Sequence, residues 1–168
     1  RRGELIDAPL GGHDELVIPL QVPADAIVVA TVGRLTAIKH QSLFLEMAAR
    51  LAQRPERFLF LLAGDGELRD ELEAQAKRLG VDARVRFLGW RGDLEAIYGA
   101  TDIFVLTSRN EGTPVALIEA MAAGLAVVST DVGGIADVIT SADLGLLVPS
   151  GDADALADAV ASLAVSAD

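Results

Sequence analysis

The sequence predicts a three-layer α/β fold in which a parallel β-sheet lies between two layers of helices. Short apolar segments alternate along the chain with amphipathic ones, which is the pattern of repeated strand–helix units. Several of these segments are apolar at nearly every position, as expected for strands that helices cover on both faces. The 168 residues are enough for one domain with a sizeable core.

Six segments are the expected strands, and stretches with helical periodicity separate them. The strands are predicted at Ile27–Gly33, Phe58–Gly64, Val85–Gly89, Ile103–Thr107, Ala126–Thr130 and Gly145–Val148. Apolar residues recur at four-residue spacing in two of the intervening stretches, at Leu43, Met47 and Leu51 and at Leu68, Leu72 and Ala76. These elements together predict a Rossmann-like sandwich with a six-stranded parallel sheet.

Three helix ends have recognisable signals. Gly80 is expected to end the second helix in the left-handed conformation that glycine adopts without strain. Thr113 is the expected N-cap, and Pro114 the expected first residue, of a helix that continues to Ala123. Asp152 is expected to open a last, alanine-rich helix.

Composition excludes several classes of partner and chemistry. The chain has 14 Lys and Arg against 25 Asp and Glu, a net charge of −11 that repels nucleic acid and anionic lipid. It has no cysteine, so disulfides, thiolate catalysis and thiolate metal sites are excluded. No apolar run approaches the roughly 18–20 residues of a membrane span. Residues 1–24 lack clear patterning and are expected to be a linker or truncated edge, with the binding domain at 25–168.

The loop after the first expected strand carries two positive charges. In open parallel sheets, ligands bind beyond the carboxyl ends of the strands. Here Gly33 allows a close approach of backbone or ligand, and Arg34 and Lys39 place two cations at one strand end. Two such groups can hold a diphosphate through charge-assisted hydrogen bonds. The alternative, a surface arginine and a surface lysine beside a helix start, stays open from this loop alone.

The loop after the fourth expected strand leads into a helix whose N-terminus is suited to an anion. Glu111 lies just before that helix, and Glu119 lies eight positions further on, within it. A carboxylate near a bound phosphate is unfavourable unless it meets another group, such as the hydroxyls of a sugar or ribose. The alternative is that both are solvated acids, but apolar residues surround Glu119, and acids seldom occur there without a partner.

Four stretches of the chain resemble the C-terminal domain of glycosyltransferase family 4, the family of retaining GT-B enzymes that includes sucrose and glycogen synthases. They are VGRLTAIKHQSLFLEMAARL, LLAGDGELRDELE, VRFLGW and SRNEGTPVALIEAMAAGLAVVSTDVGGIADVI. The resemblance covers about residues 27–165. Its most specific element is the pair of glutamates, Glu111 and Glu119, separated by seven residues within EGTPVALIEAMAAG.

The resemblance implies a role for each matching residue. Arg34 and Lys39 would bind the donor diphosphate and stabilise the departing nucleoside diphosphate, and Glu111 would contact hydroxyls of the donor sugar; these three would be the catalytic residues. Glu119 would bind the ribose hydroxyls. The remaining contacts to nucleotide and sugar would come from Gly33, Leu88, Gly89, Gly112, Thr113, Pro114 and Val115.

The sequence departs from the family pattern at three positions. His40 stands where a glycine often follows the lysine, and Ala126 and Ala136 stand where prolines are common. These departures affect loop geometry rather than charge.

Other signals have a structural explanation that is preferred. Asp152 and Asp154 imitate the metal-binding acid pair of GT-A transferases, but helix capping explains them better. Gly64-Asp65-Gly66 lacks the third glycine of a dinucleotide fingerprint and is interpreted as a turn. His13 and His40 have no neighbouring ligands, so no metal site is predicted.

Two further features are left open. Trp90 is either a rim or packing residue or one that stacks on a base. Asp131, Gly133 and Gly134 are expected to form a turn near the donor cleft, with ligand contact undecided.

The predicted function is donor binding in a retaining glycosyltransferase that uses a UDP- or GDP-sugar, needs no metal or other cofactor, and binds its acceptor in a separate N-terminal domain. On its own, this domain is expected to be inactive. The expected location is cytoplasmic, with any membrane contact made by the N-terminal domain. The alternatives are a nucleotide-sugar-binding module without catalysis and a GT-B sugar-nucleotide 2-epimerase. A nicotinamide-dependent oxidoreductase is disfavoured, because GRLTAIK replaces the triple-glycine turn.

Overall fold

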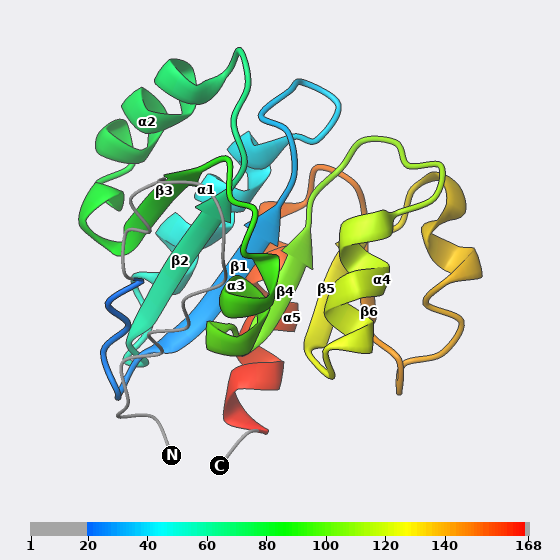
Figure 1. Ribbon diagram of the computed structural model, residues 1–168. Coiled ribbons are helices and arrows are strands. Elements are labelled where there is room, and N and C mark those ends of the chain that lie inside the picture. The colour runs from blue at the N-terminus through cyan, green and yellow to red at the C-terminus, as the bar shows by residue number, and fades with distance from the viewer. Residues whose placement is uncertain (1–19, 167–168) are drawn as a thin grey trace.

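Six parallel strands form the single sheet of the computed structural model, which describes residues 20–166 (Figure 1). Their bounds are Ile27–Val32 (β1), Phe58–Ala63 (β2), Val85–Gly89 (β3), Ile103–Leu106 (β4), Ala126–Thr130 (β5) and Leu146–Val148 (β6). All six predicted strands are confirmed, to within one residue at each end. The expectation for residues 1–24 falls mostly outside the described part of the chain, because residues 1–19, with His13, are not described.

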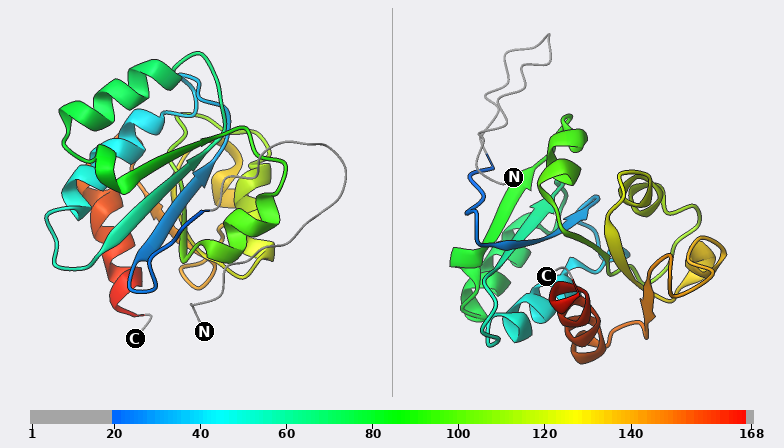
Figure 2. Two further views of the ribbon diagram at one scale, coloured as in Figure 1. Left: turned by 60° about the vertical axis from the view of Figure 1, so that its left-hand side comes forward. Right: turned by 90° about the horizontal axis from the view of Figure 1, so that it is seen from below.

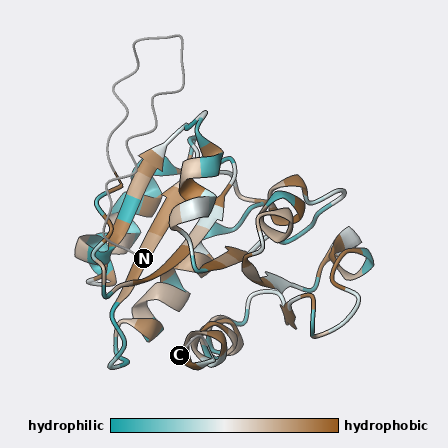
Figure 3. Cartoon of the chain, turned by 60° about the horizontal axis from the view of Figure 1, so that its bottom comes forward, coloured by the Kyte–Doolittle hydropathy of each residue, from teal (hydrophilic) through white to brown (hydrophobic). Residues whose placement is uncertain are grey.

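Helices cover both faces of the sheet, as predicted. One face carries α1 (Gln41–Leu51), α2 (Arg69–Arg78) and α5 (Ala153–Val165), and the other carries α3 (Leu94–Ala100) and α4 (Val115–Ala122). Figure 2 shows the sheet between these two groups, and Figure 3 shows that its strands are hydrophobic along much of their length. Short 3₁₀ helices occupy Asp82–Arg84 (η1) and Gly133–Asp137 (η2).

The alternation of side chains along β2 explains why both faces are covered. Phe58, Phe60 and Leu62 pack into the core beneath α1, α2 and α5. Leu59 and Leu61 point the other way, into the core beneath α3. A strand that is buried on both faces in this way is apolar at consecutive positions, and that is the pattern that predicted it.

Two of the three predicted helix ends are confirmed. Gly80 has φ 70°, and the N–H of Val81 donates to the carbonyl of Ala76 at 3.0 Å, so α2 ends in a Schellman motif. The Asp152 carboxylate accepts the N–H of Ala155 at 2.9 Å, and it therefore caps α5.

The predicted start of α4 is wrong by one residue. Pro114 has φ −82° and ψ 77°, and the N–H of Val115 donates to the carbonyl of Thr113 at 3.0 Å. Those angles and that bond define an inverse γ-turn centred on Pro114, so the helix begins only at Val115. The Thr113 side chain caps nothing, and Pro114 is the N-cap residue instead.

The order of the strands determines where a ligand can bind. The sheet runs β3-β2-β1-β4-β5-β6, so β1 and β4 are neighbours. The chain leaves β1 toward one edge and returns to β4 on the other side of β1. The loops that follow these two strands therefore lead away from each other, and this switch point is where open α/β sheets bind ligands. Within residues 20–166, no helix is both long enough and apolar enough to cross a membrane.

Candidate functional site

The candidate site lies at the carboxyl ends of β1 and β4, where the loops before α1 and α4 are joined by hydrogen bonds. The hydroxyl of Thr107 donates to the carbonyls of Lys39 and His40, each at 3.0 Å. The N–H of Arg109 donates to the carbonyl of Ile38 at 2.8 Å. These contacts fix the backbone of Lys39 relative to β4, although the two loops are far apart in the sequence.

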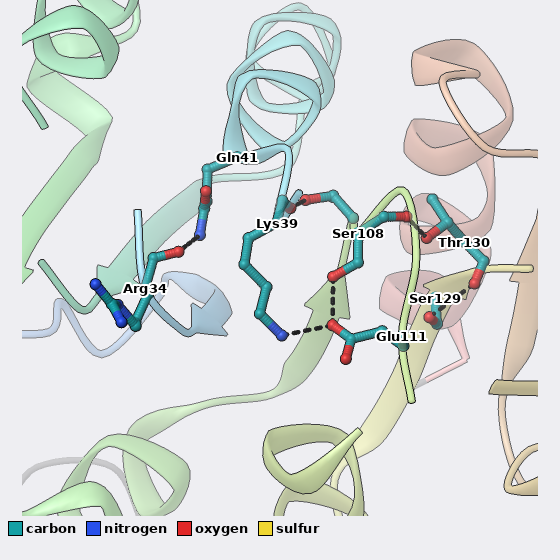
Figure 4. Close-up of polar contacts among 8 residues, drawn as sticks. Arg34, Lys39, Gln41, Ser108, Glu111, Ser129 and Thr130 are labelled. Carbon is teal, nitrogen blue, oxygen red and sulfur yellow. Dashed lines mark hydrogen bonds and ion pairs between the residues drawn. The ribbon is translucent and has the colours of Figure 1, made fainter. Parts of the chain in front are cut away.

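Lys39 and Glu111 meet at this junction (Figure 4). Lys39 Nζ lies 2.6 Å from Glu111 Oε1, and the hydroxyl of Ser108 donates to the same oxygen at 2.6 Å. The Glu111 side chain is only 7% exposed, whereas the Lys39 side chain is 30% exposed. Glu111 is therefore no solvated loop acid, and that alternative is wrong.

The second oxygen of Glu111 is available to a ligand. Oε2 has no hydrogen-bond partner among the residues that the structure describes. Next to it in the chain, Gly112 has open space where a side chain would be, because a Cβ built there meets no atom within 4 Å. A ligand can therefore approach the carboxylate over Gly112.

Arg34 comes from the same loop as Lys39 but lies differently. Its backbone carbonyl accepts the Nε2 amide of Gln41 at 2.7 Å, which anchors the loop to the start of α1. Its guanidinium is exposed and makes no hydrogen bond or ion pair within residues 20–166. In Figure 4 the guanidinium lies on the side of the loop away from Glu111. Among the described residues, Arg34 is thus a cation without a partner beside a cation, Lys39, that has one.

Glu119 lies on α4 and has the partner that its apolar neighbours predicted. The hydroxyl of Tyr98, on α3, donates to Glu119 Oε2 at 2.9 Å. Burial raises the pKa of Tyr98 above its usual range, and the hydrogen bond to Glu119 raises it further, so this hydroxyl remains a donor at neutral pH. Glu119 itself is exposed, and its Oε1 has no partner among the described residues.

The end of β3 lies apart from the other expected site residues. Leu88 and Gly89 end the edge strand of the sheet, and β2 separates them from β1. Trp90 follows them and is 70% exposed, so it is not a packing residue. Only a ligand that extends across the end of β2 would contact both Lys39 and Gly89.

Two glycine turns pack against the loops of the site. Gly64 has φ 137°, and a Cβ there would lie 1.9 Å from the carbonyl oxygen of Gly33. Gly133, with φ 52°, would bring a Cβ within 2.0 Å of the carbonyl oxygen of Glu111, and the N–H of Gly134 donates to that same carbonyl at 2.9 Å. The turn predicted at 64–66 and the one predicted near 131–134 therefore both support site backbone, the latter as the start of η2.

His40 adopts a strained conformation next to Lys39. Its φ of 51° and ψ of 45° are left-handed, the conformation in which glycine is free of strain. Its Nδ1 atom is buried without a hydrogen-bond partner in the structure. Burial lowers the pKa of His40, and the charge of Arg109 lowers it further, so the ring is neutral at pH 7. The departure from glycine at this position thus has a conformational cost.

Sequence reasoning missed the hydroxyl groups that support the two acids. Ser108 and Tyr98 each donate to one carboxylate, and Thr107 joins the two loops. The only signal for Ser108 is its position three residues before Glu111, and Tyr98 has no such signal. Within residues 20–166, no group of three or more histidine or acidic side chains could hold a metal ion.

Comparison with known proteins gives consistent matches. The model of the family described as "Glycosyl transferases group 1" matches residues 26–165. The lipopolysaccharide core biosynthesis glycosyltransferase LpsE of Rhizobium meliloti is 40% identical over 141 residues, which are 84% of this chain and 40% of LpsE. The D-inositol 3-phosphate glycosyltransferase of Saccharomonospora viridis is 36% identical over 157 residues, covering 87% of this chain and 36% of that protein.

A solved structure agrees with these relatives. The crystal structure of HepE from Anabaena in complex with UDP superimposes with a TM-score of 0.79 and 30% identity, over 86% of this chain and 41% of HepE. The chain thus spans about two fifths of the length of the proteins it matches.

Proposed function

The chain belongs to the group 1 glycosyl transferases, and from this premise we propose that it is the donor-binding domain of a retaining GT-B enzyme of family 4. It holds a nucleoside-diphosphate sugar, and a separate N-terminal domain binds the acceptor. The observation that carries the proposal is the meeting of Lys39 and Glu111 at the switch point between β1 and β4. That the chain spans about two fifths of its relatives supports a second domain.

The diphosphate is assigned to Arg34 and Lys39. Both cations belong to the loop after β1, in a chain whose net charge is −11. The guanidinium of Arg34 is exposed and has no described partner, so it can bind phosphate without losing a protein contact. When the glycosidic bond breaks, negative charge develops on the departing diphosphate, and these two cations stabilise it. We propose that this charge stabilisation replaces a divalent metal.

The sugar and the ribose are assigned to the two glutamates. Each acid presents one oxygen that no described residue contacts, Oε2 in Glu111 and Oε1 in Glu119. An ionised carboxylate only accepts hydrogen bonds, so hydroxyl groups are its natural ligands. Glu111 adjoins the cations and would contact the donor sugar, together with Gly112, Thr113 and the exposed Val115. Glu119 would contact the ribose.

The base is assigned to the end of β3. A nucleotide whose diphosphate lies at β1 can extend across β2 to Leu88 and Gly89. The solved complexes of HepE contain UDP and, in one case, UDP-glucose, which supports uracil as the first base to test. GDP-sugars are the second candidate.

Retention is attributed to the leaving phosphate. The roles above leave Glu111 and Glu119 bound to hydroxyls and give neither the role of nucleophile or general base. We therefore propose that an oxygen of the departing diphosphate accepts the proton of the attacking hydroxyl on the same face of the sugar. The acceptor oxygen then forms the new bond to the anomeric carbon as the bond to the diphosphate breaks.

Calorimetry of the isolated chain tests the donor assignment. UDP, GDP and ADP, each with and without an attached glucose, are titrated into the wild type, Glu111→Gln and Glu119→Gln. We expect Glu119→Gln to weaken the binding of the bare nucleotide. Glu111→Gln should remove mainly the additional affinity that the sugar provides. The assignment of Glu111 to the sugar is wrong if Glu111→Gln weakens the binding of the bare nucleoside diphosphate as much as that of its sugar conjugate.

Turnover separates the proposed enzyme half from a binding module. The isolated chain should bind donor without transferring sugar, with or without added divalent metal. Adding the N-terminal domain should restore transfer if the chain is half of an enzyme, and should not if it is a binding module. Transfer by the chain alone at about 1 s⁻¹ or faster would refute the assignment of the acceptor site to another domain.

A further inference from the structure

We propose that Ser108 is a positioning residue that keeps Glu111 in place while Lys39 moves from Glu111 to the donor phosphate. The inference rests on the proposed function, because it assumes that Lys39 meets phosphate and Glu111 meets sugar. It adds a residue to which neither the sequence pattern nor the family resemblance gives a role.

The first step is that Lys39 must change partners. In the structure without donor its ammonium lies 2.6 Å from Glu111 Oε1. A diphosphate carries more negative charge than one carboxylate, so it competes for the same ammonium. The lysine is free to respond, since its side chain is 30% exposed and flexible, whereas the glutamate is 7% exposed. Donor binding therefore weakens the only ion pair that Glu111 makes among the described residues.

The second step is that Glu111 then needs another donor. A buried carboxylate that loses its countercharge must keep its remaining hydrogen bonds or turn toward water. The hydroxyl of Ser108 already donates to Glu111 Oε1 at 2.6 Å. With that bond intact, Oε1 stays occupied and Oε2 stays available to the ligand.

The third step is that Ser108 cannot follow Lys39. Ser108 is completely buried, and its carbonyl accepts the hydroxyl of Thr130, on β5, at 2.6 Å. Its position is therefore set by the sheet and not by the loop that carries Lys39. The difference in mobility between the two donors of Glu111 is the reason why the serine, and not the lysine, holds the carboxylate in the loaded site.

Ser129 offers a matched control (Figure 4). It too is a completely buried serine at this end of the sheet, but its hydroxyl donates to the carbonyl of Thr130 at 3.0 Å and makes no hydrogen bond to Glu111. Replacing either serine with alanine removes one buried hydroxyl. Only the replacement of Ser108 removes a hydrogen bond to the acid that is assigned to the sugar.

The experiment measures, on the full chain, how much the sugar adds to nucleotide affinity. Dissociation constants are determined by calorimetry for UDP, GDP and ADP and for their glucose conjugates. The proteins are the wild type, Ser108→Ala, Ser108→Cys, Ser129→Ala, Glu111→Gln and the double variant Ser108→Ala/Glu111→Gln. The readout is the dissociation constant of the bare nucleotide divided by that of its glucose conjugate, so a lower ratio means that the sugar adds less affinity. Thermal melting reports on folding. A purely structural role would lower both affinities together and leave the ratio unchanged.

We expect Ser108→Ala to reduce the ratio about three- to tenfold and to leave the affinity for the bare nucleotide within about twofold. Ser108→Cys keeps a donor, on a slightly larger side chain, but the thiol donates more weakly than the hydroxyl, so its ratio should lie between those of Ser108→Ala and the wild type. It provides the test if the alanine variant fails to fold. Ser129→Ala should keep the wild-type ratio, and Ser108→Ala should have no further effect once Glu111 is glutamine.

The outcomes separate this inference from the proposed function. If Glu111→Gln lowers the ratio but Ser108→Ala does not, the role of Ser108 is refuted and the sugar assignment stands. If Ser108→Ala and Ser129→Ala change the ratio equally, the effect does not depend on the hydrogen bond to Glu111 and the inference is refuted. If Glu111→Gln leaves every ratio unchanged, or if the wild type binds none of the six compounds, the proposed function fails and this inference fails with it.

Discussion

Replacing Lys39 with methionine should destabilise the ligand-free protein, because it leaves a buried carboxylate without a countercharge. Lys39 and Glu111 form an ion pair at 2.6 Å in which the acid is 7% exposed. Methionine retains the length and apolar character of the lysine stem, so the change removes charge with little change in packing. The effect on stability therefore reports on the ion pair.

The structure limits how much stability Lys39→Met can cost. Removing one partner of a fully buried ion pair costs about 3–5 kcal/mol. Here the lysine side chain is 30% exposed and Ser108 still donates to Glu111, so the loss should be smaller, about 1–2 kcal/mol. For a domain of this size, 1 kcal/mol corresponds to about 2–4 °C in melting temperature. The expected decrease is thus about 2–8 °C.

A double-mutant cycle in urea tests this value. Glu111→Gln removes the buried charge, so Lys39→Met should cost much less in that background. The control is Arg50→Met, which breaks an ion pair with Asp154 whose side chains are 40% and 80% exposed and should cost less than about 0.5 kcal/mol. The reasoning is refuted if Lys39→Met is as stable as the wild type, or if the double variant is no more stable than expected from adding the single effects.

Three further predictions concern single residues. Arg34→Ala should leave stability unchanged and weaken the binding of a nucleoside diphosphate about tenfold or more, with little effect on the binding of the nucleoside. Equal losses of affinity for the two ligands in calorimetry would rule out a phosphate contact. Tyr98→Phe should weaken nucleotide binding about three- to tenfold, because Glu119 loses its donor; an unchanged dissociation constant would contradict this. His40→Gly should raise the free energy of unfolding by about 0.5–1 kcal/mol by relieving a left-handed φ of 51°; a lower urea midpoint would contradict the strain.

Much of the fold could be predicted because burial on two faces leaves a strong local pattern. The consecutive apolar residues of β2 and the glycine at position 80 are each readable within a few residues. The residues of helix α3 were not identified, because only two of its seven residues, Ile97 and Tyr98, are buried, and so short a stretch shows no helical period. The start of α4 was misplaced because Pro114 suits an inverse γ-turn as well as a first helical turn.

For the site too, the local sequence identified individual residues but not the contacts between residues that are far apart in the chain. Glu111 and Glu119 could be selected from their spacing in one segment, and Lys39 from its place after a strand. That Lys39 and Glu111 are bonded could not be predicted, because 72 residues separate them and only the order of the strands brings them together. The role of Tyr98 was hidden for the same reason, since it lies on the helix that local periodicity did not reveal.

The close backbone contacts at Gly64 and Gly133 have a consequence for how specificity can change. Because main chain packs directly on main chain at Gly33 and Glu111, these two contacts do not depend on the side chains that the loops carry. A ligand that binds to loops held in this way loses little affinity to the ordering of loops. Exposed side chains of these loops that are assigned to the sugar, such as that of Thr113, can then be exchanged to redesign sugar preference without rebuilding the scaffold that presents them.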